Sequence, residues 1–473
     1  MAKKMRIKLK NNIKLCRSVA MKNSVSALFS NAVNILTKFV VQKVFIEILG
    51  IEYLGLNGIL TNIVAALNIV ELGISTAIIY NLYEPLKNHK IETVKSLLRF
   101  YKKAYNIVAL LTAIIGIVLM PFLHFIIHDT VPGVNIYIAY ILVLFSSVIS
   151  YFLSYRQSLL YASQRGYIIT NIQTVGNILI AGMQILLLIL TRDFYLYLSV
   201  KIVVQLLQNI VLHKITAKKY SELCRGRALK LEKKIEKDIF QKMRALFMHK
   251  IGSFIVFSTD NIVISAFINV VTVGLYSNYS MIISALEGLF ARAIRALTPT
   301  VGNLLVDKNY IKNYKTFCKI RNVNFVISLM SSAGIMLFAG LFVKIWLGGE
   351  YILSDFTVGI LVLVHFQKMM RESFSVFKEG AGIYHEDRFV PLIESLINII
   401  ASVILVQAMG LPGVFIGTFL SSLVLWFYSY PRFVYRRLFR RSYWQYAIEV
   451  FVGGLMFAAI MAVVLQIKNI VGL

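Results

Sequence analysis

Apolar stretches of about 20 residues recur along the whole 473-residue chain, and they constrain its fold more than any other feature. A membrane-spanning helix needs roughly 20 mainly apolar residues, because the hydrocarbon core of a bilayer is about 30 Å thick. The alternation of apolar and polar residues that marks a β-barrel is absent from these stretches. We therefore predict an all-α polytopic membrane protein. Thirteen stretches meet the length requirement: residues 24–49, 58–83, 104–127, 136–155, 167–190, 194–212, 247–268, 275–301, 323–342, 356–376, 392–409, 413–430 and 446–467.

Composition agrees with a membrane protein and explains the charge. Hydrophobic residues make up 58% of the chain and charged residues only 15%, whereas soluble domains carry about a quarter charged residues. The net charge is nevertheless +28. Such an excess is also typical of nucleic-acid-binding proteins, but nucleic-acid binding does not require this apolar content. We expect no nucleic-acid partner.

The positions of the Lys and Arg residues predict the orientation of the chain. Of the 50 cations, 39 lie before the first stretch or after the even-numbered stretches, and only Arg192, Lys344 and Lys468 lie in the opposite loops. Lys and Arg concentrate in cytoplasmic loops, so the N-terminus is predicted to be cytoplasmic. The first stretch is too long for the core of a signal peptide, and no small-residue cleavage site follows it. We expect it to be a retained helix.

The longest polar segment, residues 213–246, separates six stretches from six more. We predict a basic cytoplasmic segment 1–23, an N-lobe 24–212, a basic cytoplasmic linker 213–246, a C-lobe 247–430, and a tail 431–473 that holds a basic loop and an extra helix. The basic segments are expected to contact anionic headgroups. A parallel repeat is visible at an offset of 219 residues. It aligns Gly55, Leu56, Ile63, Ala66 and Leu67 with Gly274, Leu275, Ile282, Ala285 and Leu286.

Polar and charged residues recur at helical spacing within several stretches. An ionisable side chain is costly in lipid and usually faces a bundle interior or a watery cavity. Asn, Gln and Ser also bond neighbouring helices, and lysines near a helix end, such as Lys43 and Lys201, also extend to the interface. Lys38, Arg292 and Lys368 lie more than two turns from either end, which favours a polar lumen. The lumen candidates are Asn31, Asn34, Lys38, Gln42, Asn68, Asn177, Gln205, Arg292, Arg295 and Arg371.

Deep cations on helices of both halves suit an anionic ligand, because Arg presents a fork of donors that matches phosphate oxygens. The neutral polar residues around them suit hydroxyl-rich sugars. Three carboxylates, Glu71, Asp260 and Glu287, also lie in the stretches. They either take up protons or a cation during a transport cycle, or act as internal counter-ions to the arginines. Both readings stay open at this point.

Several motifs resemble those of the Wzx-type flippases of the polysaccharide transporter family, within the multidrug/oligosaccharidyl-lipid/polysaccharide exporter superfamily. One motif is Gly50-Ile-Glu-Tyr-Leu-Gly-Leu-Asn-Gly58, with Glu71-Leu-Gly73 after it. A second begins at Arg371 and continues through Phe377-Lys378 and Gly380-Ala-Gly-Ile-Tyr384. It ends with Asp387-Arg388, Pro391, Glu394 and Asn398, of which Asp387, Arg388, Glu394 and Asn398 form the cytoplasmic family motif.

The resemblance implies two six-helix lobes around a central cationic cavity, with one or more extra C-terminal helices. It implies transport of undecaprenyl-pyrophosphate-linked oligosaccharide repeat units from the inner to the outer leaflet of the bacterial cytoplasmic membrane. These units feed capsule, O-antigen or exopolysaccharide synthesis. The pyrophosphate is expected on Lys38, Arg292, Arg295 and Arg371. Alternating access driven by an ion gradient is implied, and no GxxxxGK[ST] loop for ATP occurs in the sequence.

We predict a transporter and no enzyme, cofactor or metal. The expected partners are the lipid-linked oligosaccharide, anionic membrane lipids and other polysaccharide-assembly membrane proteins. Three alternatives remain: a drug/cation antiporter of the same superfamily, a membrane-bound glycosyltransferase or polymerase, and a scaffold for a synthesis complex. An antiporter favours an acidic, aromatic pocket, and a polymerase needs a large loop with paired carboxylates or a metal cluster.

Overall fold

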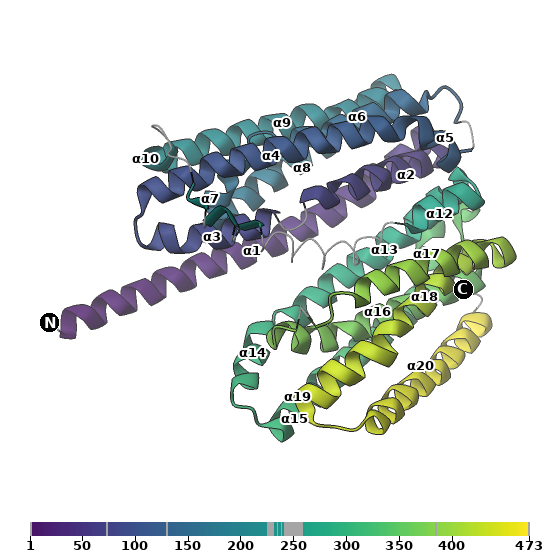
Figure 1. Ribbon diagram of the computed structural model, residues 1–473. Helices are drawn as coiled ribbons and strands as arrows, with labels where there is room; N and C mark the ends of the chain where they lie inside the picture. Colours follow the sequence, from purple (N-terminus) through teal and green to yellow (C-terminus); the bar gives the residue numbers. More distant parts are fainter. Residues whose placement is uncertain are drawn as a thin grey trace. The chain divides into compact units, whose positions relative to one another are not determined.

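The computed structural model describes residues 2–71, 74–128, 131–224, 231–233, 235–237, 239–240, 259–383 and 386–471. Every regular element in these ranges is a helix, which confirms the all-α prediction (Figure 1). The chain forms two compact units. Unit 1 is Met1–Gly50, Ile63–Leu123 and Val131–Lys250, and unit 2 is Ile51–Asn62, His124–Thr130 and Ile251–Leu473. The lobes 24–212 and 247–430 stay predictions.

Unit 1 is built mainly from long helices. Its elements are α1 (Ala2–Leu49), the end of α2 (Ile51–Leu67), a 3-10 turn (Asn68–Glu71), α3 (Ile74–Lys87), α4 (Ile91–Leu119), α6 (Ile136–Tyr151), α7 (Gln157–Ala162), α8 (Gly166–Thr191), α9 (Phe194–Lys219) and α10 (Ser221–Cys224). Between α4 and α6 lie a 3-10 turn (Met120–Phe122) and α5 (Leu123–Ile126), most of which belongs to unit 2. Helix α8 packs between α1 and α9, while α6 packs against both α4 and α9. A core of buried residues, including Tyr101 and Leu159, lies among α3, α4 and α7.

Polar contacts fix the heights of α1, α8 and α9 relative to one another. Asn23 Nδ2 donates to the Gln164 carbonyl at 2.7 Å, and Asn177 Nδ2 donates to Asn34 Oδ1 at 3.0 Å, so α1 and α8 run parallel. Helices α8 and α9 are joined by a tight turn in which the Asp193 carboxylate accepts from the first amides of α9. These two helices therefore run antiparallel.

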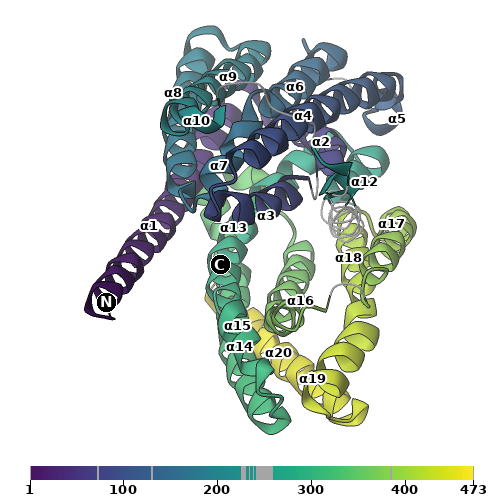
Figure 2. The same cartoon turned by 60° about the vertical axis from the view of Figure 1, so that its left-hand side comes forward.

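Unit 2 is arranged around one helix, α16 (Asp355–Gly380). The others are α12 (Asp260–Phe267), α13 (Val270–Arg295), α14 (Thr298–Val306), α15 (Tyr310–Trp346), α17 (Val390–Met409), α18 (Leu411–Val424), a π-helix (Leu425–Arg436), α19 (Arg437–Phe439) and α20 (Tyr443–Val471). A 3-10 turn (Gly349–Tyr351) precedes α16. Helix α16 contacts α13, α14, α15, α18 and the π-helix, while α20 lies along α15 (Figures 1 and 2).

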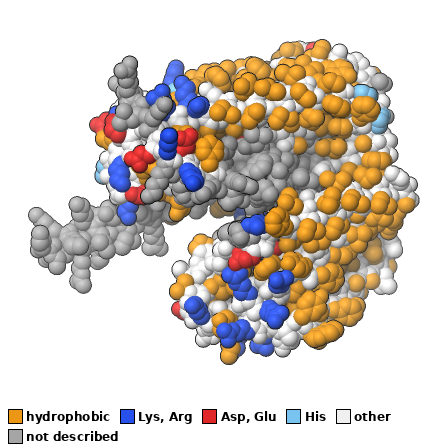
Figure 3. All heavy atoms as spheres, viewed as in Figure 1, with side chains coloured by type: hydrophobic (Ala, Val, Ile, Leu, Met, Phe, Trp, Pro, Cys, Tyr) orange, Lys and Arg blue, Asp and Glu red, His pale blue; other side chains and the backbone are white. Residues whose placement is uncertain are grey.

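Among the described residues, eight helices are long and apolar enough to cross a membrane. They coincide with the predicted stretches 104–127, 136–155, 167–190, 194–212, 323–342, 392–409, 413–430 and 446–467. The stretches beginning at 24, 275 and 356 form helices that carry the polar candidates, which lowers their apolar character. Large apolar side chains such as Leu190, Phe451 and Ile470 are exposed, as expected of a surface in lipid. In Figure 3 hydrophobic side chains cover the flanks of the visible helices, and Lys and Arg gather at one end of each unit.

The predicted bounds were wrong for two stretches, 58–83 and 275–301. Stretch 58–83 is interrupted by the 3-10 turn at Asn68–Glu71, and the helix before it begins earlier, at Ile51. Stretch 275–301 is divided: α13 runs from Val270 to Arg295, and α14 begins at Thr298 with Pro299 in its first turn, where proline is tolerated. Most of stretch 247–268 lies outside the described residues.

A reciprocal glycine contact joins α2 to α13 within unit 2. A Cβ atom added at Gly55 would lie 2.0 Å from the Val270 carbonyl oxygen, and one added at Gly274 would lie 2.5 Å from the Ile51 carbonyl oxygen. Val270 is the repeat partner of Ile51, just as Gly274 is the repeat partner of Gly55. Both glycines are therefore required by a close, pseudo-symmetric helix crossing.

We predict that Gly55→Ala and Gly274→Ala each lower the thermal unfolding temperature in detergent. The added methyl group meets backbone rather than a flexible side chain, and overpacking of this kind costs about 1–3 kcal/mol. Gly288→Ala, on the same helix as Gly274, is the matched control, because nothing lies within 4 Å of its added Cβ. Equal unfolding temperatures for Gly274→Ala and Gly288→Ala would contradict the close crossing.

Candidate functional site

Arg295 and Glu372 form a two-pronged ion pair between α13 and α16. Arg295 Nε donates to Glu372 Oε2 at 2.5 Å and Nη2 donates to Oε1 at 2.6 Å. The Glu372 side chain is only 9% exposed. Glu372 thus takes its partner from α13 and not from Lys368, which lies one turn before it on α16. Arg295, a predicted phosphate ligand, therefore already holds an internal carboxylate.

Glu287 on α13 accepts from two cationic or ionisable groups of α16. Lys368 Nζ lies 2.6 Å from Glu287 Oε2, and His365 Nδ1 lies 3.3 Å from Glu287 Oε1. The other ring nitrogen of His365 is 2.9 Å from the Ser331 hydroxyl on α15. Of the two readings of Glu287, the geometry matches the counter-ion.

Arg371 connects α16 to α17. Its Nη1 donates to Glu394 Oε1 at 2.7 Å, and its Nη2 lies 3.3 Å from Oε2. The Glu394 side chain is 3% exposed, so removal of either partner would leave a charge without compensation in a low dielectric. The family-motif residue Glu394 is thus the counter-ion of a predicted binding arginine.

The remaining motif residues hold the turn between α16 and α17 and the start of α17. Asp387 is buried, forms an ion pair with Lys378, and accepts a hydrogen bond from the Ser429 hydroxyl at 3.0 Å. Lys378 also donates to Ser429, at 3.1 Å. The guanidinium of Arg388 stacks over the Phe389 ring at 4.8 Å. These contacts are those of a structural clamp.

Asp260 is buried without a cation within ion-pair distance among the described residues. It accepts from the Thr418 hydroxyl at 3.3 Å, and Thr418 in turn accepts from Asn398 Nδ2 at 3.0 Å. The Thr259 hydroxyl completes the group by donating to Asn398 Oδ1 at 3.1 Å. A lone carboxylate surrounded by hydroxyl and amide groups is suited to take up a proton or a small cation.

The predicted neutral residues of unit 1 are half-buried, and most contact one another or neighbouring helices. Asn34 accepts from Asn177 and donates to Ser30 at 3.3 Å. Asn68 Oδ1 accepts from Ser147 at 2.7 Å and Tyr151 at 2.8 Å, while Glu71 accepts from Ser75 at 2.7 Å. Asn31 and Gln42 lie on α1, and Gln205 lies on α9. The structure thus groups Asn34 with Asn177, and it groups Asn68 with Glu71 around the Tyr151 hydroxyl.

Two predicted phosphate ligands, Lys38 and Arg292, differ from the other cations. Both are exposed, Lys38 on α1 and Arg292 on α13. Within the described part of the chain, no carboxylate lies within ion-pair distance of either side chain. Of the four predicted cations, these two remain available for an external anion.

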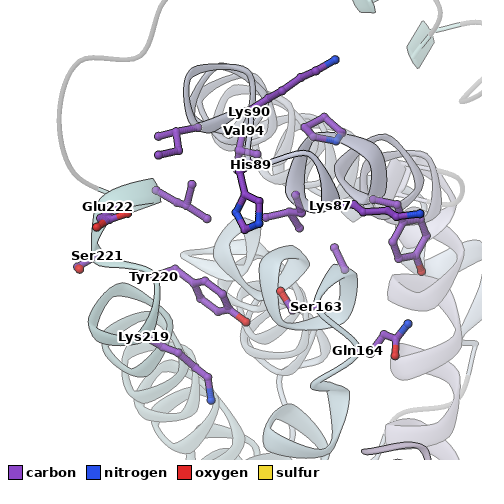
Figure 4. Close-up of a pocket in the computed structure, with 16 residues that line it drawn as sticks. Lys87, His89, Lys90, Val94, Ser163, Gln164, Lys219, Tyr220, Ser221 and Glu222 are labelled. Carbon is purple, nitrogen blue, oxygen red and sulfur yellow. The ribbon is translucent and has the colours of Figure 1, made fainter. Parts of the chain in front are cut away.

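A separate basic pocket of about 710 Å³ lies at one end of unit 1 (Figure 4). It is lined by the ends of α3, α9 and α10 and by the turns around His89 and Gln164, both of which have positive φ. Figure 4 shows the side chains of His89 and Tyr220 extending toward the space, whereas Lys90 points away. Lys87 and Lys219 also belong to the lining, against one carboxylate, Glu222. The cation distribution predicts this end to be cytoplasmic.

The sequence alone did not identify the side chains that contact Asp260 and Asp387. Thr418 and Ser429 carry no pattern that marks them, because a single hydroxyl in an apolar helix usually bonds its own backbone. Lys201 had been set aside as a residue near a helix end. The recurrence of polar and charged residues at helical spacing did indicate a charged face on the helix that holds Lys368 and Arg371, although it gave no partners.

Comparisons with known proteins agree with this architecture. A multidrug resistance MATE family transporter of the MOP superfamily, in an inward-facing conformation, has a TM-score of 0.64 and 16% identity over 91% of this chain and 96% of its own. Lipid II flippase MurJ, in an inward closed conformation, has a TM-score of 0.62 and 15% identity over 94% of this chain and 97% of its own. A MOP superfamily transporter from Pyrococcus furiosus has a TM-score of 0.52 and 16% identity, covering 94% and 96%.

The fold therefore defines a class: a multi-pass membrane protein whose fold is that of these solved transporters. Residues 20–305, more than half of the chain, match the model of the polysaccharide biosynthesis protein family. The chain belongs to that family, which confirms the predicted relationship. No curated protein matches the sequence.

We predict that Arg371→Met and Glu394→Leu each destabilise the protein, and that the double variant recovers most of the loss. Breaking a buried ion pair costs about 3–5 kcal/mol because one charge stays uncompensated, whereas replacing both partners with apolar residues is often close to neutral. Thermal unfolding of the three purified variants measures this coupling. Additive losses in the double variant would show that the two residues act independently.

Proposed function

We propose that this protein is a flippase that moves undecaprenyl-pyrophosphate-linked oligosaccharide repeat units from the inner to the outer leaflet of the bacterial cytoplasmic membrane. The observation that carries the proposal is the combination of membership in a polysaccharide biosynthesis family with a transporter fold. A chain that serves polysaccharide synthesis by transport must move a polymer precursor or the polymer itself. The repeat units would feed capsule, O-antigen or exopolysaccharide assembly.

The chemistry of the polar helices supports an amphiphilic anionic substrate. The exposed guanidinium of Arg292 offers donors for a phosphate, while Arg295 and Arg371 are held by Glu372 and Glu394. Neutral residues such as Asn31 and Gln42 suit sugar hydroxyls. The apolar exterior leaves the lipid tail in the bilayer, so the protein need only shield the pyrophosphate and glycan.

We further propose that Asp260 takes up the coupling ion, either a proton or a small cation. Glu287 is balanced by Lys368 and Glu71 is only half-buried, whereas Asp260 is buried with only neutral groups in hydrogen-bonding distance among the described residues. A buried carboxylate with only neutral groups in hydrogen-bonding distance favours a cation that neutralises it. Ion uptake at Asp260 would therefore bias unit 2 between two states.

The membrane setting follows from the same proposal. The N-terminus would be cytoplasmic, and the basic pocket around His89 and Lys219 would lie at the inner headgroups, where anionic lipids concentrate. Contacts with other polysaccharide-assembly membrane proteins belong to the proposal as well.

Deletion of the encoding gene is predicted to leave lipid-linked repeat units in the cytoplasmic leaflet. Arg292→Ala should reproduce that accumulation while the protein still reaches the membrane, because the substrate phosphate loses an uncompensated guanidinium. Leaflet-specific labelling of the lipid-linked sugar measures both effects. Lys312→Ala is the control, since Lys312 is exposed and pairs with Asp307 at 3.4 Å. Accumulation in the outer leaflet would instead identify a polymerase defect.

Asp260→Asn is predicted to remove the dependence of transport on the ion gradient. Asn keeps the shape and the hydrogen bond from Thr418, but it cannot bind a proton or balance a cation. Transport in inverted vesicles, measured with and without imposed proton and sodium gradients, tests this role. Asp307→Asn serves as the exposed control. Unchanged gradient dependence in Asp260→Asn would show that coupling lies elsewhere.

A further inference from the structure

The basic pocket at the end of unit 1 is large enough to hold a small molecule. Its volume of about 710 Å³ falls within the roughly 300–1,000 Å³ that is usual for small-molecule sites. Val94 and Ala162 belong both to its lining and to the buried core of unit 1. Figure 4 shows Ser163 and the rings of His89 and Tyr220 around the same space. The pocket therefore combines apolar residues of the core with a set of polar groups.

Two tight turns hold the polar lining in place. His89 (φ 52°) and Gln164 (φ 60°) are non-glycine residues in the left-handed region, which a chain adopts only where the surrounding contacts fix it. Next to His89, the Lys90 amide donates to the Pro85 carbonyl at 2.9 Å. The Gln164 carbonyl accepts from Asn23 Nδ2 of α1 at 2.7 Å. Both turns are thus fixed by the protein's own hydrogen bonds, which preorganises the lining.

The lining carries more positive than negative charge. It contains Lys87, Lys90 and Lys219 against one carboxylate, Glu222. Lys90 points away from the space in Figure 4 and pairs with Glu84, which lies outside the lining, at 3.3 Å. Among the residues that the structure describes, no carboxylate lies within ion-pair distance of Lys87 or Lys219. The pocket thus keeps two lysines that form no ion pair within this part of the chain.

The corresponding turn of unit 2 carries carboxylates where unit 1 carries neutral residues. Residues 163–165 before α8 (Ser-Gln-Arg) correspond to residues 386–388 before α17 (Glu-Asp-Arg). In unit 2, Glu386 accepts from Arg437 Nη1 at 2.5 Å. Arg437 follows the twelfth predicted stretch as Lys219 follows the sixth. Because a serine takes the place of that glutamate in unit 1, the lysine has no counterpart of the carboxylate that balances the arginine.

We propose that this pocket binds the phosphate monoester group of a small molecule, beside the turn position that Glu386 occupies in unit 2. Such a group carries about two negative charges at pH 7 and several acceptor oxygens. The flexible side chains of Lys87 and Lys219 supply charge-assisted donors, and the Ser163 hydroxyl and the His89 ring add further donors. The site belongs to unit 1 alone and does not depend on the flippase function.

The remaining lining provides contacts for the organic part of the ligand. A pocket of this volume holds more than a phosphate group, and the Tyr220 ring extends toward the space. Leu86 and Val94 add apolar contact area, and Gln164 adds an amide. A soluble phosphate ester and a lipid with a phosphate monoester headgroup present the same group to the lysines, so both are sources of this chemistry.

The soluble source is tested by calorimetry on purified full-length protein, with adenosine monophosphate as the probe and adenosine as its uncharged form. Lys87→Ala and Lys219→Ala are each expected to weaken binding of the phosphate probe by about tenfold, as loss of a charge-assisted contact does. Lys90→Ala is the matched control, because Lys90 lies in the same lining but points away from the space. Wild-type affinity in Lys219→Ala, or equal affinity for adenosine, would overturn the site.

The lipid source is tested in nanodiscs that contain either phosphatidic acid or phosphatidylcholine. Thermal stabilisation by phosphatidic acid that Lys219→Ala abolishes, without binding of adenosine monophosphate, would assign the site to a lipid headgroup. Calorimetric binding of adenosine monophosphate that Lys219→Ala weakens would assign it to a soluble ester. Absence of Lys219-dependent binding with both probes would overturn the proposal. Tighter Lys219-dependent binding of farnesyl pyrophosphate than of either monoester would also overturn it.

Ser163→Glu tests the comparison with unit 2. It places a carboxylate where unit 2 has Glu386, so it should pair with Lys219 and abolish binding of the phosphate probe. Ser163→Gln is similar in size but neutral, and it should weaken binding less. Thermal unfolding checks that Ser163→Glu stays folded: the added carboxylate meets a lysine, so the unfolding temperature should equal or exceed that of the wild type. Undiminished binding in folded Ser163→Glu would contradict the proposed site.

Discussion

The high free energy of an unpaired charge in a low-dielectric interior organises unit 2. Helix α16 carries His365, Lys368, Arg371 and Glu372, and these face partners on α13, α15 and α17. Because each pair is costly to break, the pairs specify which helices α16 contacts and at which height. The apolar surfaces of the same helices do not specify their neighbours in this way. An aliphatic side chain packs on lipid about as well as it packs on another aliphatic side chain.

Unit 1 follows a different rule. Its helices are aligned mainly by neutral contacts, such as Asn34 with Asn177 and Asn68 with Ser147 and Tyr151. Because these contacts are uncharged, they do not offset the positive charge of nearby lysines. Positive charge therefore persists on α1 and α9, while on α16 internal carboxylates largely offset it. The exposed lysines of α1 and α9 thus lie on helices aligned by neutral contacts, whereas α16 is held to its neighbours by ion pairs.

The sequence contained the helical class, most of the membrane-spanning helices and the polar faces, because each depends on local composition and periodicity. It did not contain the charge pairing. Lys368 and Arg295 are both chemically suitable for Glu372, and only the tertiary packing of α13 on α16 decides between them. The roles of Thr418 and Ser429 could not be predicted for the same reason. Each hydroxyl donates to a carboxylate that is distant in the sequence, Thr418 to Asp260 and Ser429 to Asp387. The break at Asn68–Glu71 was hidden by the apolar residues on both sides.

The crossing of α2 with α13 has the form of an isologous interface, in which residue i meets residue j and j meets i. Ile51 meets Gly274 as Val270 meets Gly55, at one constant offset along the chain. In a homodimer of half-length chains, a single substitution would change both sides of such a contact at once. In a single chain the two sides of the contact can change separately. The close backbone contact still requires glycine at both positions, while the residues around them are free to differ. The separate chemistries of the charged and neutral helices are a divergence that two identical chains could not show.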